Sequence, residues 1–236
     1  MDRKKFIRNS ILGIASLATA TKILESCSKN DNDDNSTDTS SDESCAVSPA
    51  ETKGPFPIKT PSQLVLENIK SDRIGVALLI NLSIENQSKD CSPLEGVLVD
   101  VWHCDKDGNY SEYGGTSMQQ TDYTSVHFLR GRQTSDASGK VSFISIFPGW
   151  YQGRAPHIHV EVLTASGSSL LVTQIAFPET ITSEVYLSTN YAAHGQADTS
   201  NTRDNVFSDS LSDELATLTG NLTDGYTLSK TITVKG

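Results

Sequence analysis

Short hydrophobic runs separated by turn residues are the feature that most limits how this 236-residue chain can fold. Most of these runs alternate in polarity and are rich in valine, isoleucine and aromatic residues: 74–85, 96–102, 140–146, 157–163 and 170–177. A period of two, bounded by Gly, Pro and Asp, is typical of β-strands. Helix signals are confined to 180–187 and 210–217. The pattern predicts a mostly β protein, a β-sandwich of mixed short strands with few short helices.

The first residues, 1–26, resemble an export signal, with a basic start followed by the apolar stretch 11–20. That stretch is shorter than the roughly 20 apolar residues that a transmembrane helix needs. The sequence LESC at 24–27 resembles a bacterial lipobox, which predicts a lipid on Cys27. The alternatives are an ordinary cleaved signal, or a start in which Cys27 is incidental. Residues 3–8 also resemble a weakened twin-arginine motif, so the export route stays open.

The stretch that follows Cys27 has the composition of a disordered segment. Residues 28–44 contain no apolar side chain and carry six acidic residues against one lysine, so they cannot bury enough surface to fold. The sequence therefore predicts a lipid-anchored acidic tether over 27–44 and one folded domain over 45–236. We expect an exported lipoprotein of the cell envelope or cell surface, or alternatively a periplasmic or secreted protein.

The charge balance limits the kinds of partner. The net charge is −10, and removal of 1–26, with five basic and two acidic residues, makes it −13. Nucleic acid is therefore not an expected partner, because phosphate binding needs clustered Lys and Arg. The membrane would be contacted through the lipid on Cys27. The charge does not restrict a small substrate, and a homo-oligomer remains open.

Three cysteines belong to the predicted domain: Cys45, Cys91 and Cys104. In an oxidising compartment one pair can form a disulfide. Cys91 and Cys104 flank one predicted strand and are the candidate pair. A bridge that involves Cys45, or three free thiols, remains open.

The clearest chemical signal is the pair His157 and His159 on a predicted strand. Period-two alternation places both imidazoles on one face, about 6–7 Å apart along the chain, where both can reach one metal ion. Tyr151 precedes the pair by six residues and Arg154 precedes His157 by three. The alternative is structural: hydrogen-bonded histidines and a tyrosine that closes the end of a sandwich. Structural roles are predicted for the remaining histidines, His103, His127 and His194.

Several motifs along the predicted domain occur in an informative order. They are TKGPF at 52–56, VDVWH at 99–103, GNYS at 108–111, FLRG at 128–131, TSDASG at 134–139, PGWY at 148–151, RAPHIH at 154–159 and TQ at 173–174. Together they resemble the intradiol ring-cleaving catechol dioxygenases, the family of protocatechuate 3,4-dioxygenase and catechol 1,2-dioxygenase. Lys53 departs from the family pattern, which usually has glutamate there.

The resemblance implies a non-haem Fe(III) site with four ligands from the protein: Tyr110, Tyr151, His157 and His159. Two phenolates are hard, strongly donating ligands that stabilise ferric iron, and two neutral imidazoles complete the set. The ordinary pKa of a tyrosine is about 10, so its phenol ionises at neutral pH only beside a strong Lewis acid.

The resemblance also implies catalytic roles for Tyr151, Arg154 and Gln174. Tyr151 would leave the metal and take up a proton from a small catechol substrate. Arg154 would stabilise negative charge on the reacting ring, and Gln174 would help to orient the ring and O2. The expected reaction cleaves the ring between its two hydroxyls and yields a cis,cis-muconate-type diacid. The alternative function is a transthyretin-like surface binding module without catalysis. Such a module explains the glycine turns that precede the tyrosines in GNYS (108–111) and PGWY (148–151), but not the four ligands together.

Overall fold

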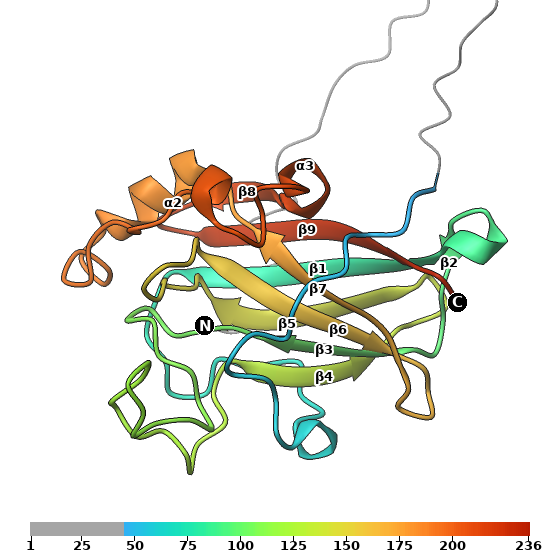
Figure 1. The fold of residues 1–236 in the computed structure, drawn as a ribbon, viewed down its shortest axis with the longest axis horizontal. Coiled ribbons are helices and arrows are strands. Elements are labelled where there is room, and N and C mark those ends of the chain that lie inside the picture. Colours follow the sequence, from blue (N-terminus) through green and yellow to red (C-terminus); the bar gives the residue numbers. More distant parts are fainter. Residues whose placement is uncertain (1–44) are drawn as a thin grey trace, which may run out of the picture. The chain divides into compact units, whose positions relative to one another are not determined.

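The computed structural model describes residues 45–236. The predicted export signal, Cys27 and the acidic tether lie outside the described residues, so those assignments stay predictions. Two β-sheets pack face to face and confirm the predicted sandwich (Figure 1). The strands are β1 (Ala77–Asn86), β2 (Ser92–Pro93), β3 (Leu98–Trp102), β4 (Arg130–Thr134), β5 (Lys140–Ile146), β6 (His157–Leu163), β7 (Ser169–Ala176), β8 (Thr217–Asn221) and β9 (Gly225–Val234).

The helical elements are few and short. The α-helices of the described residues are α2 (Glu179–Tyr186) and α3 (Leu211–Glu214), and the 3-10 turns are η1 (Pro61–Gln63), η2 (Gln87–Lys89) and η3 (Asn201–Arg203). No helix within 45–236 is both long enough and apolar enough to span a membrane.

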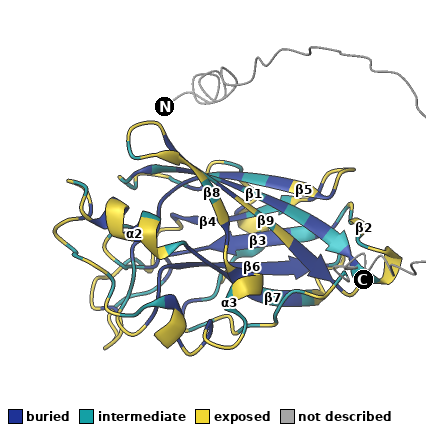
Figure 2. Ribbon diagram, turned by 90° about the horizontal axis from the view of Figure 1, so that it is seen from above, coloured by how far each residue is buried: buried dark blue, intermediate teal, exposed yellow. Residues whose placement is uncertain are grey.

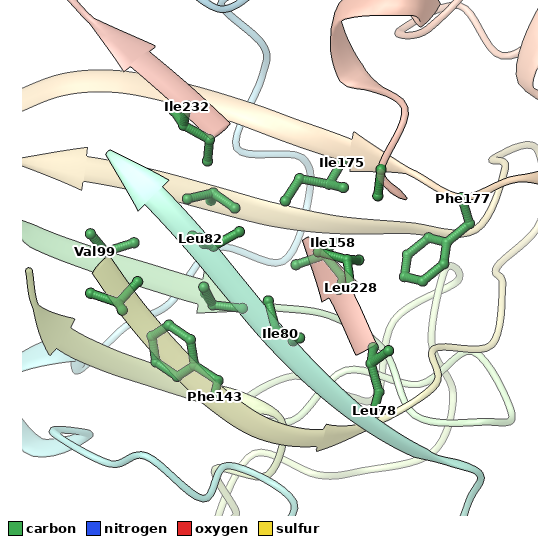
Figure 3. Close-up of a cluster of buried hydrophobic side chains, with 14 of the residues drawn as sticks. Leu78, Ile80, Leu82, Val99, Phe143, Ile158, Ile175, Phe177, Leu228 and Ile232 are labelled. Carbon is green, nitrogen blue, oxygen red and sulfur yellow. The ribbon is translucent and has the colours of Figure 1, made fainter. Parts of the chain in front are cut away.

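The first sheet has the strand order β2-β1-β9-β8, and β5 also pairs with β1. β1 runs parallel to β9 and antiparallel to β5. Buried and half-buried residues alternate along the whole of β1, because one face of the strand packs on the core and the other is more accessible. Leu78, Ile80 and Leu82 point from β1 into the core (Figure 3).

The second sheet has the order β4-β3-β6-β7, with antiparallel neighbours throughout. Val99, Ile158 and Ile175 project from its inner face toward the first sheet (Figure 3). His159 lies on its outer face, where it is paired with Trp102 on β3 and with Gln174 on β7. Every residue of β6 is buried, on both faces (Figure 2).

The outer face of β6 is buried because the first described residues cross it. The Glu51 amide donates to the Val172 carbonyl, 2.7 Å away, and Gln174 Nε2 donates to the Thr52 carbonyl at 2.9 Å. A backbone carbonyl and a side-chain amide of β7 thus serve as hydrogen-bond partners for this segment in place of a further strand. A polar sheet face under a cover of irregular chain is where the predicted site residues lie.

Most of the predicted elements are confirmed, with ends that differ by up to three residues. β5 and β6 have the predicted bounds, whereas β2, β4, β8 and β9 were not predicted. β4 reads RGRQT and has no apolar residue, so its sequence lacks a strand signal; pairing with β3 fixes its conformation. The helix predicted over 210–217 ends earlier, because residue 217 already begins β8.

The candidate disulfide between Cys91 and Cys104 is wrong. Cys45 is bonded to Cys91, with their Cα atoms 5.6 Å apart, and Cys104 is a buried free thiol. Cys91 lies in the connection between β1 and β2. The Cys104 side chain instead packs with Phe56, Trp102 and Tyr110.

Candidate metal centre

His157 and His159 lie on the outer face of β6, as the alternation predicted. Both side chains are buried, and their Nε2 atoms are 3.1 Å apart. Two nitrogen ligands about 2.1 Å from one ion and roughly at right angles would be separated by about this distance. Trp102 stacks on the His159 ring, with centroids 4.8 Å apart and an interplanar angle of 3°. This stacking fixes the plane of one imidazole.

Hydrogen bonding settles the tautomer of His157. Its Nδ1 lies 2.6 Å from the Ala155 carbonyl, and a carbonyl only accepts, so Nδ1 carries the proton and Nε2 has a free lone pair. Burial is the main reason that the pKa of His157 falls to about 3, and the charge of Arg154 lowers it further. Burial and the neighbouring His157 hold the pKa of His159 well below its ordinary value. Both imidazoles are therefore neutral, as metal ligands must be.

Tyr110 reaches the histidines from the loop after β3. Its Oη is 3.3 Å from His157 Nε2, and its ring is fully buried. Gln119 fixes the backbone here, because its side chain accepts from the Tyr110 amide and donates to the Tyr110 carbonyl, each at 2.7 Å. Burial raises the pKa of Tyr110 well above 10. Without a cation close by, this phenol stays protonated.

Tyr151 is brought beside Tyr110 by the packing of two glycine turns. The centroids of the two tyrosine rings are 5.7 Å apart, and the Tyr151 ring is 5.5 Å from that of His157. Gly108, at φ +82°, lies so close to Trp150 that a Cβ would overlap its carbonyl. The Gly149 amide donates to the Asp105 carbonyl at 3.0 Å. Both turns that the sequence pattern singled out therefore meet at the site.

Arg154 is buried beside Tyr151, with 8% of its surface exposed. Nη1 donates to Tyr151 Oη at 3.3 Å and Nη2 donates to Gln174 Oε1 at 2.7 Å. Its Nε pairs with Asp204 at 2.9 Å. Sequence reasoning found Arg154 and Gln174 but missed Asp204, which lies 50 residues downstream in a polar stretch without a motif.

The first described segment forms a wall of the site. Phe56 stacks on Tyr110 at 4.7 Å and meets Tyr151 edge-on at 5.9 Å. Gly54 has φ +65°, and a Cβ there would lie 3.0 Å from His159 Cε1, so only glycine lets the backbone approach this closely. Lys53, the departure from the family pattern, pairs with Glu161 and does not contact the four predicted ligands.

The other three histidines are held by hydrogen bonds. His103 is fully buried between the Ser145 hydroxyl at 2.7 Å and the Cys104 carbonyl at 2.8 Å. His127 is partly exposed and contacts the Glu112 carboxylate at 2.8 Å. His194 packs on Trp150 and contacts its carbonyl. None of these contacts involves the four predicted ligands.

The donor set fits ferric iron better than a softer ion. Within 45–236, no three His, Cys, Asp or Glu side chains are grouped to hold a metal ion, so a metal here depends on the tyrosine oxygens as well as the imidazoles. Two phenolate oxygens and two neutral nitrogens suit a hard, highly charged cation.

The sequence of this chain is similar to those of known proteins. A family model described as a dioxygenase matches residues 54–208. The chain is 29% identical over 149 residues to a chlorocatechol 1,2-dioxygenase of Rhodococcus opacus, over 53% of this chain and 54% of the relative. It therefore spans about half the length of this curated relative.

Solved structures are also similar to it. An intradiol ring-cleavage dioxygenase from Tetranychus urticae superposes with a TM-score of 0.72 and 27% identity, over 81% of this chain and 95% of that one. The dioxygenase domain of a dioxygenase carbohydrate-binding protein fusion from Streptomyces sp. SirexAA-E has a TM-score of 0.56 and 25% identity, over 80% and 99%.

Proposed function

This chain belongs to the intradiol ring-cleaving dioxygenases, and we propose that it binds Fe(III) and cleaves a catechol ring between its hydroxyls with O2. One observation carries the proposal: Tyr110 Oη and the Nε2 atoms of His157 and His159 converge. His157 Nε2 lies 3.3 Å from Tyr110 Oη and 3.1 Å from His159 Nε2. A binding module without catalysis gives no reason for this convergence. The ring-opened product would be a cis,cis-muconate-type diacid that contains both atoms of O2.

Bound ferric iron would supply a Lewis acid that lowers the pKa of the phenols and of the substrate hydroxyls. The two tyrosines differ in freedom. Tyr110 is fully buried and stacked on Phe56, whereas Tyr151 is only partly buried. Tyr151 is therefore the tyrosine that can move, and its Oη would take up a proton from a substrate hydroxyl.

Arg154 supplies a positive charge next to the Tyr151 hydroxyl. Its Nη1 lies 3.3 Å from Tyr151 Oη, so it stabilises a phenolate there and negative charge on a ring bound next to it. Gln174 accepts from Nη2 at 2.7 Å and donates to the Thr52 carbonyl. Gln174 thereby links the guanidinium to the wall of the site. The buried aromatic rings of Phe56 and Trp102 keep water from the reacting groups.

Colour and oxygen uptake test this function. The purified chain should take up ferric iron and become red-brown, because tyrosinate-to-iron charge transfer absorbs visible light. With catechol it should consume O2 and form a product with the ultraviolet absorbance of a conjugated diacid. A chain that stays colourless after iron reconstitution contradicts the metal site. A coloured chain that consumes no O2 with any catechol contradicts the reaction alone.

We also propose that the protein is exported and anchored by a lipid on Cys27, from the lipobox-like sequence LESC at 24–27. Cys27→Ala should move the protein from the membrane fraction of the native host to the soluble fraction. Metabolic labelling with a fatty acid should fail in the variant. Equal labelling of both proteins would contradict the lipid anchor and leave the catalytic proposal unaffected.

A further inference from the structure

Asp204 is a fully buried carboxylate that no sequence motif indicated. It follows η3, which is anchored to α2 because the Asn201 amide donates to Glu179 Oε1 at 2.6 Å. The Asn201 side chain also donates to the Phe177 carbonyl. These contacts fix the backbone that presents Asp204. Its carboxylate then reaches across to residues 154 and 155, which lead into β6.

The first contact of Asp204 is with Arg154. Both carboxylate oxygens accept from Nε, at 3.0 and 2.9 Å. With Nε engaged there, the terminal nitrogens point the other way, toward Tyr151 and Gln174. A guanidinium is planar, so one ion pair at Nε fixes the direction of both remaining donors.

The second contact is with the residue that sets the tautomer of His157. Asp204 Oδ2 accepts from the Ala155 amide at 2.7 Å, and the Ala155 carbonyl accepts from His157 Nδ1 at 2.6 Å. Asp204 Oδ1 also accepts from the Val206 amide at 2.9 Å. The carboxylate is thus connected to a tyrosine through Arg154 and to a histidine through Ala155.

We propose that Asp204 is the positioning residue of this centre, which orients Arg154 toward Tyr151 and holds His157 with Nε2 free for the metal. The proposal rests on the proposed function for its catalytic consequence, but the orientation of His157 exists without iron. All three groups that face Asp204 are N–H donors. An acceptor-only carboxylate satisfies them, whereas the amide of asparagine would turn an NH2 group toward one of them.

Asp204→Asn is the test, with Asp100→Asn as matched control. Asp100 is also a buried carboxylate that pairs with an arginine, Arg132 on the neighbouring strand β4. Its side chain forms no hydrogen bond with any of the four proposed ligands. In Asp204→Asn we expect kcat/KM and iron affinity to fall about 10- to 100-fold, as outer-shell substitutions do. The charge-transfer band should shift. The Asp100→Asn variant should be less stable to heat than wild type. Its charge-transfer band should not shift, and its kcat/KM should stay within about 3-fold of the wild-type value.

Imidazole 15N shifts of the iron-free protein provide the second readout. Wild type and Asp100→Asn should show His157 with the proton on Nδ1, and Asp204→Asn should show a mixture of tautomers. Unchanged His157 shifts and an unchanged band in Asp204→Asn would mean that Asp204 only stabilises the fold. If Asp204→Asn does not fold, Asp204→Glu, which keeps the charge, takes its place. The His157 15N shifts of Asp204→Glu should lie between those of wild type and those of a tautomer mixture. Wild-type shifts in Asp204→Glu would also overturn the proposal. A wild-type chain that binds no iron overturns the proposed function, while the tautomer measurement still decides the role of Asp204.

Discussion

At the scale of single residues, Tyr110 is the proposed ligand whose removal separates chemistry from folding. Its hydroxyl contacts His157 in the core of the site, and loss of one buried hydrogen bond costs about 1 kcal/mol. Tyr110→Phe should therefore fold, lose or shift the charge-transfer band, and lose activity by at least about 100-fold, more than an outer-shell change. Visible spectra and O2 uptake of the iron-loaded variant provide the measurement.

The control for Tyr110→Phe is Tyr191→Phe. Tyr191 is equally buried, and its hydroxyl donates to the Phe147 carbonyl at 2.7 Å in the main core. Because this hydroxyl also accepts from the Val76 amide at 3.2 Å, its loss should lower stability at least as much and leave the spectrum unchanged. An unchanged band in Tyr110→Phe would show that Tyr110 is not a ligand.

Gly54 tests the wall of the site. Gly54→Ala introduces a Cβ 3.0 Å from His159 Cε1 at a backbone φ of +65°. The left-handed conformation costs a non-glycine residue about 1–2 kcal/mol, and the contact should also displace His159. Gly96→Ala is the matched control, because φ is +78° and no atom lies within 4 Å of its Cβ. Both variants should melt at lower temperature, but only Gly54→Ala should change the visible spectrum. Identical spectra would show that His159 tolerates the contact.

At the scale of elements, the sequence predicted those that carry their own pattern. The alternation of β6 placed His157 and His159 on one face, and the glycine turns indicated where Tyr110 and Tyr151 emerge. β4 lacks any such signal. Asp204 was missed for the same reason: its role comes from a contact with Arg154 that only the folded chain brings together. Local periodicity and motifs carry no information about such long-range contacts.

α3 contains a carboxylate with a testable pH dependence. Glu214 is buried and one of its oxygens has no hydrogen-bond partner. Burial raises its pKa to about 7, and the charges of Glu51 and Asp209 add to this effect. Because the folded pKa exceeds the unfolded value of 4.5, the folded state binds more protons between pH 4.5 and 7. Stability from this group is therefore present below pH 4.5 and is lost as the pH rises through 7.

Glu214→Gln removes that charge. The free energy of unfolding of the variant should rise relative to wild type between pH 5 and pH 8, by on the order of 2 kcal/mol. Urea unfolding at both pH values provides the measurement. Asp213→Asn, an exposed neighbour on the same helix, should show no such change. A difference between Glu214→Gln and wild type that does not vary with pH would contradict the assigned pKa.

At the scale of the whole molecule, the site depends on chain segments that are far apart in sequence. The cover over β6 comes from residues 51–56, the proposed ligands lie within 110–159, and the carboxylate proposed to position them is that of residue 204. The sequence predicted a single domain that contains all of these, but not that its first residues close the site. These six residues have no strand or helix pattern, and the contacts with the sheet beneath them set their conformation.

The Cys45–Cys91 disulfide holds the start of this cover. It closes a loop with a sequence separation of 46 residues, which in the chain-entropy description is worth about 4 kcal/mol. The cover has further attachments closer to the site, because Arg130 donates to the Phe56 carbonyl and Gln174 to the Thr52 carbonyl, each at 2.9 Å. A double change of Cys45 and Cys91 to Ser should therefore lower the unfolding free energy by about 4 kcal/mol, while the ligand geometry persists.

Hydrogen exchange and visible spectra distinguish the loss of stability from a change in ligand geometry. Amides at 45–51 should exchange faster in the double variant, whereas the visible band of the iron-loaded protein should stay unchanged. Wild type should lose the same stability in a reductant, and the double variant should not respond to it. Loss of the band in the double variant would mean that the disulfide holds the wall of the site itself. In that case the attachments at Phe56 and Thr52 would not suffice, and activity would depend on an oxidising compartment.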